Sequence, residues 1–588
     1  MINRRVAAPL AGVLVGSSLL LVQPAAASPQ ASPVRPGAEK KPVAEGYGGA
    51  VSTVDLDAGK VALGVLRQGG NAMDAAVAAA AALGVTEPYS AGLAGGGFIV
   101  YYDARHKKVH TIDGRETAPK AMGPTSLEGI PFEEAVTSGL SAGVPGSVAQ
   151  WELALRKFGT LSLKQALKPA TELASKGFKV DQTFYDQTAA NAARFKDFTS
   201  TAKLYLPNGA PPPVGSTFRN PELAETYRKL GKQGGGWLYG GSLGAEVVAT
   251  VKKPPVTPGS TRNVRPGLME LADLKAYRAL ERPPTKVTYK GMDVYGMAPP
   301  SSGGSTVGEA LNILQVLPKV GEHEYLEASR LSFADRGKYV GDIPGVPLQE
   351  LLSDGFAKER ACLIGERALT SPVAPGNPDG TYGPCAPAPS AEATPSAPEG
   401  PETTHLVVTD RWNNVVAYNI TIESTGGNGI VVPGRGFLLN NELTDFTFGP
   451  APGDPNLPAP GKRPRSSMAP TIVLDDGRPL LALGSPGGST IITTVLQILV
   501  NRWDLGMSLP EALAAPRATQ RNTPQTQAEQ AYIDRYGAEL TERGHSLVLN
   551  PEIGAATAVE FLRNGRLQAV AEPTRRGGGS ALVVNERR

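Results

Sequence analysis

The chain has 588 residues, and its 58 Lys and Arg against 55 Asp and Glu give a formal net charge of +3 at pH 7. Such a balance argues against nucleic-acid binding, which needs a basic excess on one face or tail. The five His and two Cys do not stand at the spacing of a metal site, and the glycine-rich stretches lack the spacing of a nucleotide-binding loop. We therefore expect no metal and no other cofactor.

The N-terminus has the pattern of a secretory signal peptide. Arg4 and Arg5 form a basic start, residues 6–22 are apolar, and the small residues at 25–27 fit a cleavage site. The apolar run is broken by Gly and Ser and is short for a membrane-spanning helix, which takes about 20 apolar residues. We expect residues 1–27 to be removed and the mature protein to be secreted, into the medium, a periplasm or a cell-wall space, with no membrane span.

A long body follows a short leader. Residues 28–46 are rich in Pro, Ala and Lys and are predicted to form a disordered leader. Residues 47–402 make up the larger part of the mature chain. Its predicted elements are a helix over 72–83 that is apolar on every side and so buried, paired strands over 97–102 and 108–113, and helices near 148–157 and 324–339.

A change of composition separates this body from a C-terminal part. Residues 370–402 are dense in Pro, Ala, Gly and Ser and are predicted to form an unpacked linker that ends where regular structure resumes, at Thr403. The elements predicted after it are strands over 403–410 and 414–421, a hairpin over 470–484 that turns at 475–477, and an apolar helix over 491–500. Strands and helices alternate irregularly, which indicates layered α and β structure.

Cys362 and Cys385 are the only thiols. Outside the cell they could form a disulfide, which would close a loop of about 24 residues and add roughly 3 kcal/mol in the chain-entropy model. They could also be unrelated, because Cys385 lies in the low-complexity linker. Both interpretations stay open.

Two kinds of nucleophile follow from the residues alone. Ser141 and Ser242 lie in Gly-x-Ser-x-Gly patterns, but neither follows the apolar strand that a nucleophile elbow needs. Thr403 begins a strand directly after the linker, and a cut before it would expose an α-amino group. That amine, with a pKa of about 7.7–8.0, can act as the base for the threonine's own hydroxyl, so no His is required. The alternative is an ordinary edge strand after a loop.

One motif, TTHLVVTD at 403–410, is similar to the signature of the γ-glutamyltranspeptidase family, N-terminal nucleophile hydrolases that cut themselves before this Thr. The resemblance covers about 46–360 and 403–586. The motifs that carry it include GGGFIVYYD (95–103), DGRETAP (113–119), VPGSV (144–148), PPSSGGST (299–306), FADRGKY (333–339), LLNNELTDF (438–446), KRPRSSMAPT (462–471) and GSPGGSTIITTVLQ (484–497). It implies an α/β (α+β) fold, a four-layer αββα sandwich, built from a large subunit (47–402) and a small catalytic subunit (403–588) of one self-cleaved precursor.

The resemblance also implies catalytic roles. Thr403 would be the nucleophile, both for self-cleavage and for attack on the substrate. Thr421 would hydrogen-bond and orient it. The backbone amides of Gly487 and Gly488 would form the oxyanion hole, in a loop before a helix where unpaired N–H groups favour a developing negative charge.

A binding site for the γ-glutamyl group is implied as well. Arg115 would pair with the substrate α-carboxylate, a task suited to a guanidinium, and the hydroxyls of Ser466 and Ser467 would bind the same group. Glu442 and Asp445 would hold the α-ammonium, since their i, i+3 spacing fits a turn that directs both toward one cation. Each of these residues also has an interpretation without function. Arg115 could form a surface ion pair with Glu116, the two serines could form an ordinary turn, and the two acids could lie in a solvated loop.

Two features depart from the family pattern. Glu423 stands where the family commonly has Asn, two residues after the orienting Thr. A third carboxylate near the two predicted acids strengthens the attraction for an ammonium group but adds like-charge repulsion, which raises a carboxylate pKa. The segment 446–465 is shorter than in members with a long lid and has no Tyr, so we expect a more open pocket that admits bulkier donors.

The sequence thus predicts a secreted, self-processing γ-glutamyltransferase or glutathione hydrolase. Its partners would be γ-glutamyl compounds such as glutathione and amino-acid or peptide acceptors, and its two subunits would pair as a heterodimer. A close alternative is an acylase of the same fold for other acyl donors, such as glutaryl-β-lactams, although a donor without an α-ammonium suits an acid-rich pocket poorly. The remaining alternatives are a processed but inactive extracellular binding protein and a serine esterase that uses Ser141 or Ser242.

Overall fold

The computed structural model describes residues 40–383, 402–449 and 451–587 of the uncut chain. Most strands form two antiparallel sheets that share β1. The first sheet holds, in order, β6 (Leu280–Arg282), β3 (Lys108–Asp113), β2 (Gly96–Asp103), β10 (Val415–Thr421), β9 (Thr404–Asp410), β1 (Val43–Thr53) and β18 (Ser580–Asn585). The second continues from β1 through β17 (Leu567–Ala571), β16 (Thr557–Phe561), β12 (Arg478–Gly484), β11 (Thr471–Asp475), β8 (Met292–Gly296) and β7 (Thr285–Tyr289). Short strands outside them are β4 (Phe178–Lys179), β5 (Thr217–Phe218), β13 (Ala518–Thr519), β14 (Thr526–Ala528) and β15 (Leu547–Leu549).

Strand β1 passes from one sheet to the other. Its residues 43–46 pair with β17, whereas residues 49–53 pair with β9, and 50–53 also with β18. Gly48 and Gly49 lie between the two parts with φ of 78° and 136°, and the register with β18 shifts there. Glycine takes such positive φ values at no steric cost, so the chain can change sheets at this point.

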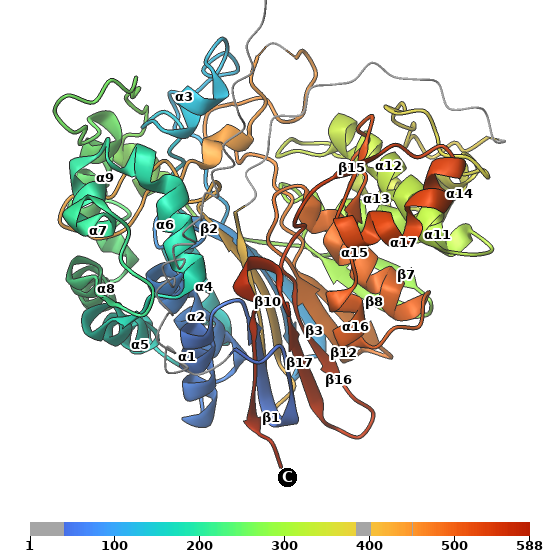
Figure 1. Cartoon of the computed structure of the whole chain (residues 1–588), viewed down its shortest axis with the longest axis horizontal. Helices are drawn as coiled ribbons and strands as arrows, with labels where there is room; N and C mark the ends of the chain where they lie inside the picture. The colour runs from blue at the N-terminus through green and yellow to red at the C-terminus, as the bar shows by residue number, and fades with distance from the viewer. Residues whose placement is uncertain (1–39, 384–401, 450, 588) are drawn as a thin grey trace, which may run out of the picture. The chain divides into compact units, whose positions relative to one another are not determined.

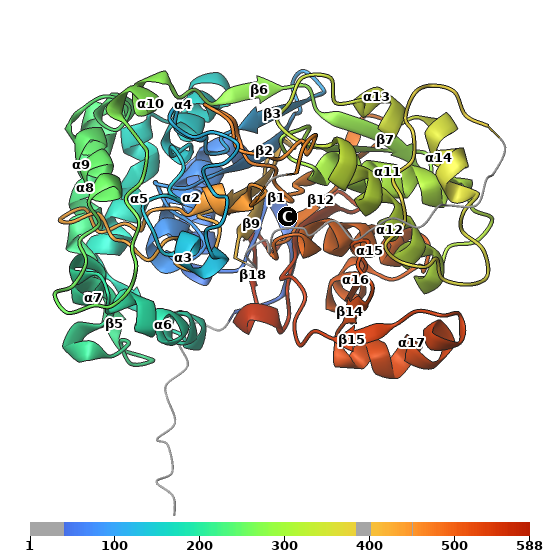
Figure 2. The same ribbon diagram turned by 90° about the horizontal axis from the view of Figure 1, so that it is seen from above.

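Helices cover the outer face of each sheet (Figure 1). Beside the first sheet lie α1 (Leu56–Arg67), α2 (Ala72–Thr86), α3 (Phe132–Val136), α4 (Ser147–Phe158), α5 (Leu163–Lys176), α6 (Gln182–Phe195), α7 (Thr199–Tyr205), α8 (Pro221–Gln233), α9 (Ser242–Lys252) and α10 (Leu271–Ala276). Beside the second lie α11 (Gly303–Val316), α12 (Glu322–Tyr339), α13 (Leu348–Leu351), α14 (Asp354–Ala361), α15 (Thr490–Trp503), α16 (Leu509–Ala514) and α17 (Gln530–Glu542). Figure 2 shows the same two groups from above.

Strand β10 is buried on both faces, as a strand between a helical layer and a second sheet must be. Val416, Tyr418 and Ile420 belong to the core that contains α2. Val415 and Ala417, which point the other way, belong to the core that contains the second sheet. This arrangement confirms the predicted four-layer αββα sandwich.

The structure confirms the regular elements predicted from the sequence. Every residue of α2 is buried, as expected for a helix that is apolar on all sides. The predicted pairs 97–102 with 108–113 and 403–410 with 414–421 form β2–β3 and β9–β10, and the hairpin over 470–484 forms β11–β12. The predicted helices correspond to α4, α12 and α15.

Two predicted boundaries need correction. The leader was predicted to reach residue 46, but β1 begins at Val43 because residues 43–46 complete the edge of β17. The unpacked linker was predicted from residue 370, but residues 370–383 contact the body: Val373 is buried, and its backbone exchanges hydrogen bonds of 2.8 and 3.0 Å with the side chain of Asn522. Composition alone cannot foresee such contacts, since their partners lie far away in the chain.

Several predictions concern residues outside the described ranges. These are the signal peptide, most of the leader, and the part of the linker that holds Cys385, so the pairing of Cys362 with Cys385 stays a prediction. Within the described ranges, none of the helices combines the length and the apolar character that crossing a bilayer requires.

Candidate active site

One cavity, of about 250 Å³, brings together nine of the ten predicted site residues. They are Arg115, Thr403, Thr421, Glu423, Glu442, Asp445, Ser466, Ser467 and Gly488. Glu402, Met468 and Ile491 complete the lining, and the tenth predicted residue, Gly487, precedes Gly488 in the chain. Residues from both predicted subunits therefore meet at one place.

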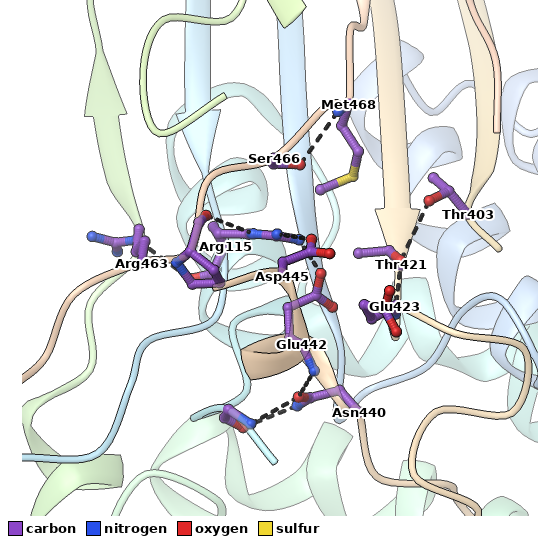
Figure 3. Close-up of polar contacts among 12 residues, drawn as sticks. Arg115, Thr403, Thr421, Glu423, Asn440, Glu442, Asp445, Arg463, Ser466 and Met468 are labelled. Carbon is purple, nitrogen blue, oxygen red and sulfur yellow. Dashed lines mark hydrogen bonds and ion pairs between the residues drawn. The ribbon is translucent and has the colours of Figure 1, made fainter. Parts of the chain in front are cut away.

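The predicted nucleophile lies where two neighbouring strands of the first sheet meet. Thr403 immediately precedes β9, and Thr421 ends β10, which pairs with β9. The Thr403 hydroxyl donates a hydrogen bond of 3.4 Å to Oγ1 of Thr421 (Figure 3). The Thr421 hydroxyl in turn donates one of 3.1 Å to the carbonyl oxygen of Glu402. The backbone N–H of Glu423 donates a hydrogen bond of 2.9 Å to the Thr421 hydroxyl. A single hydroxyl thus links the predicted nucleophile to the peptide group in front of it.

Arg115 lies at the other end of the cavity and is buried, with 1% of its side chain exposed. Its guanidinium donates to the carboxylates of Glu442 and Asp445 (Figure 3). It also donates to the carbonyl oxygens of Pro464 at 3.2 Å and Arg465 at 3.0 Å. Four of its five N–H donors are therefore used within the protein, and the alternative of a surface ion pair is excluded.

The fourth ionisable group of this cluster is Glu116, which the sequence suggested only as the partner of Arg115 in a surface ion pair and not as a site residue. No donor elsewhere in the described ranges reaches its carboxylate oxygens or Oε2 of Glu442, and the two acids hydrogen-bond each other. Burial raises the pKa of Glu116 to about 8, against the lowering effect of Arg115. Burial likewise raises the pKa of Glu442 well above its usual value, with further contributions from the charges of Glu116 and Asp445. One arginine thus faces three acidic groups, two of which burial favours in the protonated form, and a bound cation would favour their ionisation.

The side-chain amide of Asn440 fixes the turn that carries the two predicted acids. Glu442 and Asp445 begin and end a single 3₁₀ turn, as their spacing suggested, although the cation they meet in the structure is Arg115. The Asn440 side chain donates to the carbonyls of Ala94 and Gly143 at 2.7 and 2.9 Å and accepts the Glu442 amide at 3.0 Å. Because both carbonyls belong to the large part of the chain, this asparagine ties the turn to it (Figure 3).

Glu423 lines the cavity from a strained backbone position. Its φ is 78°, in the left-handed region that side chains other than glycine, Asn and Asp rarely adopt. Its carboxylate accepts a hydrogen bond from the Ser424 hydroxyl. Asn is among the residues best suited to this backbone conformation, which gives a physical reason for the Asn that the family commonly has here.

The two predicted serines are positioned by groups that the sequence did not single out. Ser466 forms a bridge with Ser301, beside β8 and α11. Arg336 on α12 donates hydrogen bonds of 2.8 Å to the hydroxyls of both Ser467 and Ser302. These contacts join the predicted small subunit to the large part of the chain. They lie at the side of the cavity where the substrate α-carboxylate is expected to bind.

Gly487 and Gly488 have φ of 134° and 55°, in the loop between β12 and α15. Their carbonyl oxygens accept the first hydrogen bonds of the helix, from the amides of Thr490 and Ile491. In the described part of the chain, neither glycine amide donates to an acceptor. Two N–H groups at a helix N-terminus are thus left for an anion, beside Thr403 in the cavity lining.

The alternative nucleophiles have no base. The Ser141 hydroxyl is buried and donates to the carbonyl oxygen of Ser138 at 3.1 Å, and Ser242 accepts a hydrogen bond from Trp237 at 2.8 Å. All five His lie in the described ranges, and none of them contacts either serine. Those same ranges contain no group of three or more His, Cys, Asp or Glu arranged for a metal ion.

A second arginine at the cavity was also missed. Arg576 donates a hydrogen bond of 2.6 Å to the carbonyl oxygen of Thr403 and one of 2.7 Å to the carboxylate of Glu402. It lies 173 residues after Thr403, outside the motifs quoted above, so no spacing in the sequence pointed to it.

Comparison with known proteins places the chain among relatives of two named activities. A glutathione hydrolase proenzyme of Bacillus subtilis is 35% identical over 570 residues, which cover 94% of each chain. The acylase ACY 1 proenzyme of Pseudomonas sp. strain V22 is 33% identical over 557 residues, covering 91% of this chain and 93% of the acylase. The crystal structure of a cephalosporin acylase from Bacillus halodurans matches with a TM-score of 0.81 and 26% identity, over 94% of this chain and 98% of the acylase.

The family model for γ-glutamyltranspeptidase matches residues 58–582, which is most of the chain. The match includes every residue that lines the cavity, most of both helical layers and the strands of both sheets except β1 and the end of β18. The chain therefore belongs to the γ-glutamyltranspeptidase family.

Proposed function

We propose that this protein is a secreted γ-glutamyltransferase and glutathione hydrolase that cuts itself before Thr403. One observation supports this proposal above others. A threonine hydroxyl and a buried ion-pair cluster of Arg115 with Glu442 and Asp445 line the same cavity, at opposite ends. The cluster is suited to the charged end of an amino acid, and the hydroxyl to the acyl group that the amino acid's side chain carries.

Self-cleavage uses the geometry of the uncut chain. The Thr421 hydroxyl polarises the Glu402 carbonyl through its 3.1 Å hydrogen bond, and Thr403 Oγ1 attacks the carbonyl carbon. The C–Oγ bond forms as the C–N bond breaks, and the hydroxyl proton passes to the amide nitrogen. Water then hydrolyses the ester, which leaves a carboxylate on Glu402 and a free amine and hydroxyl on Thr403.

Substrate turnover uses the new amine. It takes the proton from Thr403 Oγ1, which attacks the γ-carbonyl carbon of the donor, and the Gly487 and Gly488 amides stabilise the oxyanion. The amine passes the proton to the leaving nitrogen, and a γ-glutamyl ester remains on Thr403. Water or the amine of an acceptor attacks that ester carbon, the C–Oγ bond breaks, and the proton lost by the attacking group returns to Oγ1.

Donor recognition follows from the charges at the Arg115 end. The α-ammonium would lie among the carboxylates of Glu116, Glu442 and Asp445. The α-carboxylate would use the remaining N–H of Arg115 and the two serine hydroxyls. A second candidate function, acylase activity on donors without an α-ammonium, is favoured by the acylase relatives, but such a donor would leave the excess negative charge uncompensated.

Export is part of the same proposal. It is supported by the basic and apolar pattern of residues 1–27. N-terminal sequencing of the protein recovered from the medium or cell-wall fraction should give a start near Ser28. Retention of residues 1–27 on an intracellular protein would contradict it.

The central experiment compares wild type with Thr403→Ala and with Thr404→Val, a matched control whose buried hydroxyl has no hydrogen-bond partner. Denaturing gels should show two subunits for wild type and Thr404→Val and one chain for Thr403→Ala. A γ-glutamyl anilide should release its chromophore only with the two cleaved proteins, and a glutaryl anilide much more slowly. An uncut protein with full activity would refute the proposed mechanism, and a preference for the glutaryl anilide would favour the acylase function.

A further inference from the structure

We infer that the pocket that holds the Glu402 side chain in the uncut chain binds, after cleavage, the carboxylate of the acceptor. The inference rests on the proposed function and extends it, because it names the residues that bind the carboxylate of an amino-acid or peptide acceptor. The leaving peptide of the donor, which occupies the same side of the ester, would use the same pocket. We call this pocket the Glu402 pocket and define it by Ser90, Gln187 and Arg576.

The Glu402 pocket already holds a carboxylate of the chain itself. Oε2 of Glu402 accepts hydrogen bonds from Arg576 at 2.7 Å, from Ser90 at 3.2 Å and from Gln187 at 3.5 Å. The side chains of Glu402 and Arg576 are only 17% and 12% exposed. Three donors, one of them a guanidinium, thus converge on one carboxylate that is largely shielded from water, where charge-assisted hydrogen bonds are strong.

The backbone at Arg576 is held in a conformation that an arginine rarely adopts. Its φ and ψ are 53° and 38°, in the left-handed region, and its amide donates to the Glu552 carboxylate at 3.0 Å. Non-glycine residues in this region cluster at functional sites, where the surrounding structure maintains the strain. The conformation places the guanidinium between the pocket and the backbone of the nucleophile, since its other nitrogen bonds the Thr403 carbonyl at 2.6 Å.

Cleavage changes the charge balance of the pocket. Once the bond before Thr403 is cut, Glu402 is a chain end and no longer tied to the site. Its departure removes the nearest carboxylate from Arg576. The remaining acids whose charge acts on Arg576 are Glu87, 3.7 Å from the guanidinium, and Glu552, whose influence is the smaller. Burial raises the pKa of Glu87 to about 7, so this group carries only part of a charge near neutral pH. A shielded guanidinium without a full counter-charge is costly, and an incoming carboxylate removes that cost.

The Glu402 pocket also adjoins the nucleophile, because Arg576 contacts both Glu402 and Thr403. In Figure 3, Thr421 and Thr403 lie on one side of the Arg115 cluster, and Arg576 reaches Thr403 through its carbonyl. A donor bound at Arg115 therefore directs its leaving nitrogen away from that cluster. A dipeptide whose amine meets the ester extends by one further residue, about 3.8 Å between Cα atoms, which is comparable with the reach of the Glu402 side chain from its own carbonyl.

The test compares two acceptors that differ only in charge, glycylglycine and glycylglycine amide, with a γ-glutamyl anilide as donor and the purified cleaved enzyme. We expect the acceptor KM to be at least about tenfold lower for glycylglycine, and this ratio to fall close to one in Arg576→Gln. Arg576→Lys should retain part of the preference. Arg521→Gln, a control at an arginine that contacts Ser489 and Gln527, should retain all of it.

The outcomes separate this inference from the proposed function. Wild type without any release of the anilide would refute the proposed function. Normal hydrolysis with equal KM for the two acceptors, or an unchanged preference in Arg576→Gln, would overturn the inference alone. If Arg576→Gln stays uncut, Ser90→Ala and Gln187→Ala decide the question: a ratio reduced about threefold or more supports the pocket, and an unchanged ratio overturns it.

Discussion

Two buried clusters of charge in this molecule differ in how completely they are paired. In the first, beside α16, two arginines meet two carboxylates: Arg517 and Arg575 bind Glu529 and Glu572. All four carboxylate oxygens accept hydrogen bonds. Burial alone would raise the pKa of Glu529, but the hydrogen bonds and charge of Arg575 lower it below its usual value. The carboxylates of this cluster are fully paired without a ligand, and the Nε of Arg517 is left without an acceptor among the described residues.

The second cluster, at Arg115, is incomplete. One guanidinium pairs with Glu442 and Asp445, and Glu116 is left to hydrogen-bond another acid, Glu442. The pKa values of Glu116 and Glu442 are raised, the opposite of Glu529. Complete pairing is typical of a structural cluster, whereas an unmatched buried charge indicates a place that a ligand completes. The four predictions below test that distinction.

Removal of Arg115 should have the largest effect on activity. Arg115→Gln removes the guanidinium that Glu442 and Asp445 share and an N–H for the donor carboxylate, so kcat/KM for a γ-glutamyl anilide should fall by about 10²–10³. Steady-state kinetics on the cleaved fraction measures this. A decrease in kcat/KM of less than about tenfold would mean that the donor does not bind at Arg115.

Removal of Arg517 should instead affect stability. Arg517→Gln leaves the Glu572 carboxylate short of a partner, and we expect the free energy of unfolding to fall by about 3–5 kcal/mol. Denaturant unfolding reports the change. The donor KM of the folded enzyme should equal that of wild type, and a KM change as large as that in Arg115→Gln would remove the contrast between the clusters.

Glu116→Gln should flatten the pH dependence of stability. An acid whose pKa is raised from about 4.5 to about 8 binds more protons in the folded state, so its contribution to stability is complete below pH 4.5 and is lost as pH rises toward 8. The wild-type free energy of unfolding should therefore fall, relative to the variant, by at most about 1.4 kcal/mol per pH unit in that window. Unfolding curves at pH 5, 6.5 and 8 measure the difference. A constant difference would mean that Glu116 does not hold a proton.

Glu423→Asn should have the smallest effect. Asn tolerates φ near 78° better than Glu, so we expect a gain in stability of up to about 1 kcal/mol. The donor KM should rise several-fold, because one carboxylate near the ammonium site is lost. Thermal unfolding and kinetics with several donors test both parts, and unchanged KM for all donors would remove Glu423 from the site.

The sequence predicted the site well where its residues lie in short motifs. Thr403, Glu442 and Asp445 stand in runs whose chemistry and spacing are local, and each lies at the cavity. Glu116 and Arg576 were missed as site residues for a different reason. Glu116 is significant only because folding buries it beside Glu442, and Arg576 only because its backbone brings it to Thr403 from the far end of the chain.

The amino-acid sequence by itself determined the alternation and length of the apolar runs, and with them the strands, the buried helix α2 and the layered αββα architecture, because hydrophobic periodicity is a local property. Only the tertiary structure decided which charges are paired, which are left over and which donors converge on Glu402. Pairing and desolvation depend on distances between residues hundreds of positions apart, and those distances exist only once the two sheets have packed.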